Sequence, residues 1–209
     1  KELASVAKRC NVRIVEDDPY WRLADAPPPP IATFAPEQVY YISTLSKCLT
    51  PGLRVAFVLI REQHERERFL AALRSFALMV APLTAALATQ WILDGSADGL
   101  MDGVRKEARL RHRMARDVLA GRYSGTGDCL HVWLELPAYW SASQFARAAD
   151  SQGIAVTPAE AFATGSGPGV NAIRISLGSI KDRGRLRAGL QRLSYLLAQR
   201  PEAFSAAVV

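Results

Sequence analysis

Three short apolar runs near the start of the chain constrain its fold most. They are Val12–Glu16, Gln38–Ser43 and Arg54–Ile60, and the third is apolar at nearly every position. Strands that are buried on both faces have this composition, and they occur in parallel sheets covered by helices. The sequence therefore predicts an α/β fold with a parallel-type sheet.

Segments with helical spacing of apolar residues flank and follow these runs. Helices are predicted at residues 2–10, 63–79, 82–93, 98–120, 141–152 and 182–197, with Ser141 as an N-cap. Further strands are predicted at residues 129–136, 154–157 and 172–176. Near Gly121 the helical spacing of apolar residues gives way to a strand-like alternation. This change predicts three parts, which are a domain over residues 1–96, a bridging helix over 97–120 and a small α/β domain over 121–209.

One lysine, Lys47, follows directly after the second strand run. Thr44 and Ser46 precede it, and a Pro-Gly turn is predicted to bring Arg54 back toward it. A lysine held and desolvated at a strand end has a lowered pKa and becomes a nucleophile for carbonyls. Hydroxyls and a guanidinium suit a phosphate dianion. An aldehyde that carries a phosphate is pyridoxal 5′-phosphate, PLP, which we therefore predict as the cofactor.

Other candidate groups lie at the ends of predicted strands, where α/β folds bind ligands. Asp17 and Tyr20, in Glu-Asp-Asp-Pro-Tyr, offer a carboxylate and a phenol for the cofactor ring, although this segment also suits a simple turn. Arg174 stands in an apolar strand and needs a carboxylate or phosphate, either of a ligand or of a structural ion pair. The turn Thr157–Phe162 is either a pocket wall or an ordinary surface loop.

Taken in this order, these pieces resemble the aminotransferase class I/II family, the fold type I PLP-dependent enzymes. The specific pattern is Thr44-Leu-Ser-Lys47 followed by Pro51-Gly-Leu-Arg54. Asp17 and Tyr20 match the Asp-x-x-Tyr motif of the family, and Arg174 matches its C-terminal arginine. The resemblance runs from Lys1 to about Gln199. It implies that residues 1–96 are the C-terminal part of the large PLP-binding domain.

The resemblance also implies a role for each matching residue. Lys47 would form the Schiff base with PLP and move the proton of the substrate Cα. Asp17 would keep the ring nitrogen protonated, and Tyr20 would donate to the ring oxygen. The phosphate would be held by Thr44, Ser46 and Arg54. Arg174 would bind the substrate carboxylate through two parallel bonds, so the implied reaction is amino-group transfer between an amino acid and a 2-oxo acid.

The segment Ala35–Arg54 is also similar to the MocR branch of GntR-type transcriptional regulators. In that branch a DNA-binding winged helix-turn-helix precedes an aminotransferase-like domain. The alternative function is therefore a PLP- or amino-acid-sensing effector domain with little or no transaminase activity. DNA would then be bound only through an N-terminal domain that is absent here. An inactive scaffold is a third alternative, and the family implies a homodimer.

The chain lacks the first half of the large domain of this family. That half supplies a glycine-rich phosphate loop and an aromatic residue that stacks on the ring. The chain starts at Lys1, without methionine and inside a helix-like segment, so we expect a fragment or a processed chain.

Composition excludes several other classes of protein. No apolar stretch is long enough for a bilayer, so no membrane partner is expected. The three histidines are scattered, and no metal site is expected. The three cysteines indicate reduced thiols and a cytoplasmic location. The net charge is +6, and its densest basic stretch, residues 105–116, is predicted to be a solvated helix face rather than a nucleic-acid contact.

Overall fold

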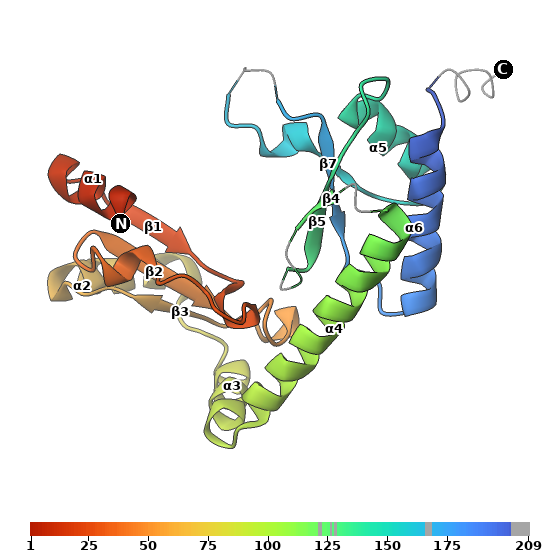
Figure 1. The fold of residues 1–209 in the computed structure, drawn as a ribbon. Coiled ribbons are helices and arrows are strands. Elements are labelled where there is room, and N and C mark those ends of the chain that lie inside the picture. The colour runs from red at the N-terminus through yellow and green to blue at the C-terminus, as the bar shows by residue number, and fades with distance from the viewer. Residues whose placement is uncertain (121–122, 126, 128, 166–168, 202–209) are drawn as a thin grey trace. The chain divides into compact units, whose positions relative to one another are not determined.

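The computed structural model describes residues 1–120, 123–125, 127, 129–165 and 169–201. The chain forms two compact units, Lys1–Arg105 and Lys106–Val209, and each is described by itself (Figure 1). The α/β class is confirmed in both units. The three-part division at residues 96 and 120 stays a prediction.

The sheet of the first unit has the strand order β1-β2-β3. These strands are Ile14–Asp17 (β1), Val39–Thr44 (β2) and Ala56–Leu59 (β3). β1 and β2 are parallel, whereas β2 and β3 are antiparallel. The loop between β2 and β3 is too short for the crossover that a parallel pair requires, which explains the reversal.

The expectation that the third apolar run is buried on both faces is wrong. All four residues of β3 are exposed, and Leu59 keeps 63% of its surface accessible. The physical reason is position, because β3 is the last strand of its sheet among the described residues. Its apolar side chains are therefore available for contacts that the described residues do not provide.

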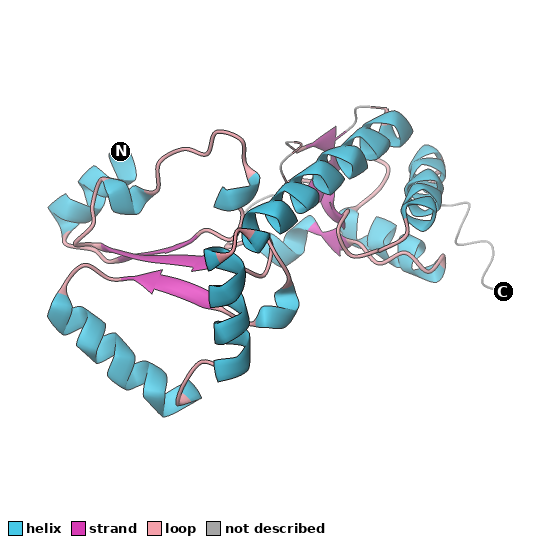
Figure 2. Ribbon diagram, turned by 90° about the horizontal axis from the view of Figure 1, so that it is seen from below, coloured by secondary structure: helices cyan, strands magenta, loops and turns pink. Residues whose placement is uncertain are grey.

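Helices lie on both sides of this sheet (Figure 2). α1, Glu2–Cys10, packs Ala4 against Ala35 and Val39. α2, Gln63–Ala77, is joined to the sheet through a hydrogen bond from the Tyr40 hydroxyl to Glu65, 2.7 Å long. No residue of α2 is buried, and α3, Pro82–Leu93, buries only one.

The second unit packs three helices on one face of an antiparallel sheet. The strand order is β4-β5-β7-β6, with β4 at Tyr123–Ser124, β5 at His131–Glu135, β6 at Thr157–Pro158 and β7 at Ala172–Ser176. α4, Ser96–Leu119, begins in the first unit and ends in this one, and α5, Ala142–Ser151, and α6, Arg183–Ala198, follow. One apolar core joins them, with Trp140, Phe145 and Leu134 fully buried.

Local sequence signals set most of these boundaries. Ser141 accepts a hydrogen bond from Gln144 N and forms a complete capping box at the start of α5, which confirms the predicted N-cap. The strand predicted at residues 154–157 is wrong, because β6 starts only at Thr157. Within the described residues, no helix is both long and apolar enough to cross a membrane. None of the three cysteines, all of which are described, takes part in a disulfide.

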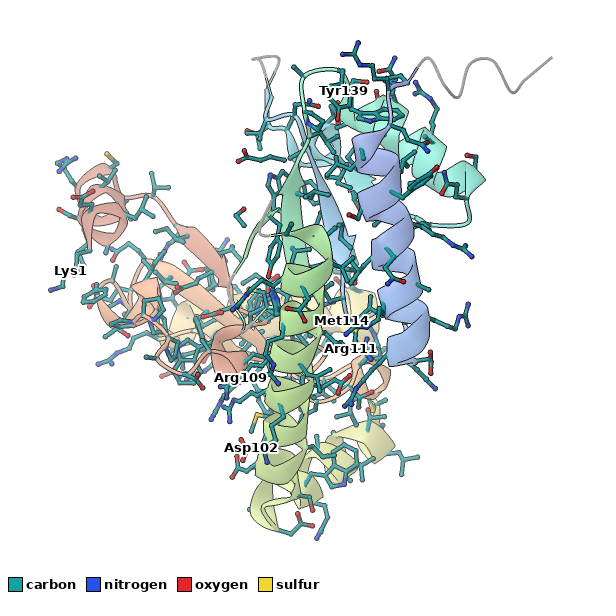
Figure 3. All side chains as sticks on the ribbon, turned by 45° about the vertical axis from the view of Figure 1, so that its right-hand side comes forward. Lys1, Asp102, Arg109, Arg111, Met114 and Tyr139 are labelled. Carbon is teal, nitrogen blue, oxygen red and sulfur yellow. The ribbon has the colours of Figure 1, made fainter. Side chains whose placement is uncertain are left out.

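The basic stretch of α4 is only partly a solvated face. Arg113 and Arg116 are exposed as predicted, but Arg111 and His112 are buried. Arg111 donates hydrogen bonds to the backbone oxygens of Leu177 (2.6 Å), Ile180 (2.5 Å) and Lys181 (2.9 Å). Figure 3 shows this side chain between α4 and the N-terminal end of α6. The arginine thus satisfies the carbonyls of the connection between β7 and α6.

A carboxylate completes this polar cluster. Glu107 accepts a bond from Arg111 Nε (2.6 Å) through one oxygen and a bond from Arg183 Nη2 (2.5 Å) through the other. The hydrogen bond from Arg183, together with that from Arg111, lowers the pKa of the Glu107 carboxyl from 4.5 to about 2. The cluster therefore joins α4 to the first turn of α6.

We expect this ion pair to make stability depend on pH in acid. Because the pKa is depressed in the folded state, the unfolded chain binds more protons between about pH 5 and pH 2, so stability falls as pH falls through this window. Since the Glu107 side chain is 32% exposed, the expected loss is about 1–2 kcal/mol rather than the full value of the shift. Urea titrations at a series of pH values would measure it. Glu107→Gln should flatten this dependence, whereas Asp150→Asn, an exposed change on α5, should not.

Candidate functional site

The lysine loop joins β2 to β3 in the first unit. Leu45 N donates to Val55 O (3.2 Å), and Thr50 N donates to Leu45 O (3.2 Å), so the ends of the loop are fastened together. A short 3₁₀ helix, Pro51–Leu53, makes the turn, with Thr50 Oγ1 accepting from Gly52 N at 3.3 Å. The predicted turn is therefore present, and it returns the chain beside the start of the loop.

Two hydroxyls lie together where β2 ends. Thr44 Oγ1 is 3.0 Å from Ser46 Oγ and accepts a hydrogen bond from Ser46 N at 3.2 Å. It also lies 3.3 Å from Val55 O, next to Arg54 in sequence. The loop thus holds the Thr44 and Ser46 hydroxyls in contact. It also brings Val55, the residue that follows Arg54, beside them. The two hydroxyls are groups that can donate to a phosphate.

Arg54 has an unusual backbone conformation. Its φ is 53° and its ψ is 38°, which is the left-handed region that non-glycine residues rarely occupy. A residue in this region costs on the order of 1 kcal/mol or more. The side chain is exposed, so packing does not explain why arginine stands there.

Lys47 lies in the same loop and is exposed. Within the part of the chain that the structure describes, its amine makes no hydrogen bond or ion pair. The described residues therefore do not provide the desolvation that the sequence predicts. The next residue, Cys48, is buried, and burial raises the pKa of its thiol. Cys48 thus anchors the loop while Lys47 faces outward.

Asp17 ends β1 and shares a sheet face with Thr44. Asp17 is paired with Ile42 in the parallel register, and side chains alternate along β2, so Ile42 and Thr44 point to the same side. Asp17 is exposed, whereas Tyr20, three residues later, is half-buried. The two acids beside Asp17 bind backbone groups of the first unit. Glu16 accepts hydrogen bonds from Ile31 N and Ala32 N, and Asp18 accepts one from Trp21 N. Of the three acidic residues, Asp17 alone lies on the face of Thr44.

Asp18 is an acidic residue that the sequence analysis did not single out. Its carboxylate accepts from Trp21 N at 3.1 Å and bonds to the Tyr41 side chain. Burial raises the pKa of Asp18, and burial together with the Asp18 charge raises the pKa of Tyr41. Asp18 directly follows the last residue of β1, and the alternation of side chains along an extended chain predicts that it lies on the face opposite to Asp17.

Arg174 lies on β7 in the second unit. Its Nη2 is 3.5 Å from Thr157 Oγ1, and its guanidinium carbon lies 4.8 Å from the centroid of the Phe162 ring. Its Nε is buried without a hydrogen-bond partner among the described residues. A structural ion pair, the alternative for this arginine, is not present in the described part of the unit. Arg174 can therefore receive an anion.

We expect Arg54→Gly to separate stability from function. Glycine occupies the left-handed region without strain, so the free energy of unfolding should rise by about 0.5–1 kcal/mol. If Arg54 binds the cofactor phosphate as the sequence predicts, the cofactor affinity of the complete protein should fall about tenfold or more, because a charged hydrogen bond is lost. Asn11→Gly is the matched control, since Asn11 has a φ of 49° at the end of α1. It should raise stability and leave cofactor affinity unchanged; an unchanged affinity for Arg54→Gly as well would contradict the assignment.

The chain is similar in sequence to known transcriptional regulators and aminotransferases. No protein-family model matches the chain. The chain is 34% identical over 201 residues to the uncharacterized HTH-type transcriptional regulator YdeF of Bacillus subtilis, covering 93% of this chain and 42% of that protein. It is 29% identical over 209 residues to 2-aminoadipate transaminase of Thermus thermophilus, covering 94% of this chain and 52% of that protein. The chain spans about half the length of these relatives.

A solved structure shows the same fold. The α-aminoadipate aminotransferase LysN of Thermus thermophilus, complexed with N-(5′-phosphopyridoxyl)-L-leucine, superposes with a TM-score of 0.82 at 26% identity. The match covers 99% of this chain and 54% of that one. Both units of the chain thus have counterparts in that structure.

Proposed function

Since the chain is a relative of the aminotransferase class I, fold type I PLP-dependent proteins, we propose that it is the C-terminal part of a PLP-binding effector domain of a MocR/GntR-type regulator. The observation that carries this proposal is the 34% identity to an HTH-type regulator, which extends over both units and includes the lysine loop. The domain would bind PLP and an amino acid and would change DNA binding by a separate N-terminal domain.

The residues of the first unit fit the cofactor as a partial set. Thr44, Ser46 and Arg54 supply hydroxyl and guanidinium donors for a phosphate, and the Lys47 amine is accessible to an aldehyde. Asp17, on the face of Thr44, would hold a protonated ring nitrogen. Tyr20 would donate to the ring oxygen. Residues 1–96 would accordingly be the C-terminal part of the PLP-binding domain.

PLP supplies an electron-withdrawing ring that stabilises negative charge at the Cα of a bound amino acid. The chain would contribute the groups that bind and orient. Arg174 would hold the α-carboxylate, which fixes the position of the Cα. The Lys47 amine would take or return the proton at that carbon. Binding alone is enough for a sensor, whereas turnover needs the proton transfer.

A second candidate function is transamination between an amino acid and a 2-oxo acid. The observation that favours it is the 29% identity to 2-aminoadipate transaminase over 94% of this chain. Lys47, Asp17 and Arg174, which this reaction needs, are all present. An inactive scaffold would not need to keep both Lys47 and Arg174, so their presence favours a protein that binds the cofactor and an acid.

An absorption spectrum with added PLP, then borohydride reduction and peptide mapping, tests cofactor binding. It should be run on this chain and on the product of the full reading frame. We expect a pyridoxyl group on Lys47 in the longer protein. Its absence there would overturn the proposal and would favour the scaffold.

Operator binding and amino-acid turnover then separate the two functions. For a regulator, the affinity of the full product for its own upstream DNA should change when PLP and an amino acid are added. For an enzyme, 2-oxo acid should accumulate with repeated turnovers and DNA affinity should be unaffected. We further propose a homodimer in the cytoplasm. Apolar side chains on α2 and α3, such as Phe76 and Leu83, are exposed and could lie against a partner.

A further inference from the structure

One face of the second sheet carries a row of three side chains. In the antiparallel register, Trp133 on β5 is paired with Arg174 on β7, and Arg174 is paired with Thr157 on β6. Paired residues of neighbouring strands point to the same side, so the three lie next to one another. The opposite face, with Val132, Leu134 and Ile173, is fully buried in the core. The row therefore lies on the face that the core leaves open.

Phe162 covers the centre of this row. It ends the 3₁₀ turn Ala159–Phe162 that follows β6, and 44% of its surface is exposed. Its ring centroid lies 4.8 Å from the Arg174 guanidinium carbon and 5.6 Å from the Trp133 ring, which it meets edge to face. One aromatic side chain thus contacts both the arginine and the tryptophan.

The contact with Phe162 restricts the orientation of the guanidinium. A guanidinium that stacks on a ring keeps its plane fixed and leaves its N–H edge for hydrogen bonds. At that edge, Nη2 has only the 3.5 Å approach to Thr157, and Nε has no partner among the described residues. A buried donor without an acceptor is costly, so this edge favours a ligand with acceptor oxygens.

We propose that Phe162 positions Arg174 as a carboxylate receptor, and that Phe162 and Trp133 together select acids with a large apolar side chain. This inference rests on the proposed function, in which Arg174 holds the carboxylate. It adds the residue that orients Arg174 and the class of acid that the site prefers.

The selectivity follows from the groups beside the arginine. Trp133 and Phe162 are both accessible in part and offer aromatic surface on which an apolar side chain can pack. Glu135 lies on the same face, two residues beyond Trp133 on β5, and it is exposed. Its negative charge disfavours a second carboxylate on the ligand. A monocarboxylate with an aromatic end therefore suits this site better than a dicarboxylate.

The test is an NMR titration of the chain without cofactor, using 3-phenylpropanoate, acetate and glutarate as probes. The Nε–H signal of Arg174 is assigned by its loss in Arg174→Lys and reports directly on the receptor. We expect 3-phenylpropanoate to shift this signal and to bind about tenfold more tightly than acetate, because the ring is partly buried. Glutarate should bind no more tightly than acetate, and neutral 3-phenylpropanamide should not shift the signal.

Two variants at position 162 show whether the Phe162 ring is needed for binding of 3-phenylpropanoate. Phe162→Leu should weaken 3-phenylpropanoate about three- to tenfold, the range expected for loss of a cation–π contact. Phe162→Tyr should restore binding, and Tyr195→Leu, which removes an exposed ring on α6, should leave it unchanged. Circular dichroism confirms that each variant is folded.

Equal affinity for all three acids, or wild-type binding by Phe162→Leu, would overturn the inference. Because the titration contains no PLP, it does not depend on Lys47. If this chain binds the acid but the longer protein never forms the lysine adduct, the proposed function is refuted and the receptor stands. If the lysine adduct forms normally but the chain shows no preference among the acids, the receptor is refuted and the proposed function stands.

Discussion

Replacement of Lys47 by alanine is expected to abolish covalent attachment of PLP in the complete protein. No pyridoxyl peptide should be recovered after borohydride reduction, because the attached amine is gone. If the protein is an enzyme, transamination should fall on the order of 10²–10⁴-fold, the range for loss of a positioned proton-transfer group. If it is a regulator, the response of DNA binding to PLP should disappear.

Lys8→Ala is the matched control for this variant. Lys8 is an exposed lysine on α1 in the same unit, so its removal changes the net charge equally. It should leave the adduct, the turnover and the DNA response unchanged. An adduct that persists in the Lys47 variant would mean that another lysine reacts and that the motif has been assigned wrongly.

The second large effect concerns folding. Arg111→Met should lower the free energy of unfolding by about 3–5 kcal/mol, the cost of removing one member of a buried charged cluster. The side chain is 7% exposed and donates to three backbone oxygens as well as to Glu107. Methionine fills a similar volume but leaves these acceptors without a donor. Urea denaturation of wild type and variant measures the difference.

Arg113→Met on the same helix provides the comparison. Arg113 is exposed, so the loss should be within about 0.5 kcal/mol. Arg111→Lys should lie between the two variants, because one ammonium cannot reach all of the acceptors of a planar fork. A loss below about 1 kcal/mol for Arg111→Met would show that water replaces the arginine.

The sequence predicted the elements whose pattern is local. α1 and α3 begin and end at the predicted residues, and β7 does the same, because apolar spacing and flanking loop residues define them. Thr44, Ser46 and the Pro-Gly turn were also predictable, since they lie within one short segment. Their contacts in the loop depend on few distant residues.

Features that depend on distant contacts could not be predicted in this way. Arg111 is buried because the connection between β7 and α6 packs over it. Nothing in the sequence of α4 indicates that the carbonyl groups of this connection need a donor. The exposure of β3 is the reverse case, since its apolar sequence predicts cover that the described residues do not supply. The stacking of Phe162 on Arg174 likewise depends on the register of β6 with β7.

The left-handed backbone of Arg54 has a consequence for evolution. Every arginine codon becomes a glycine codon by a change of a single base, so random drift always has a path to the residue that fits this backbone best. If Arg54 binds the phosphate as proposed, then in a lineage that no longer needs this contact selection for folding would favour that step rather than oppose it. Among descendants of this protein, glycine at this position would therefore mark those in which the site has fallen out of use.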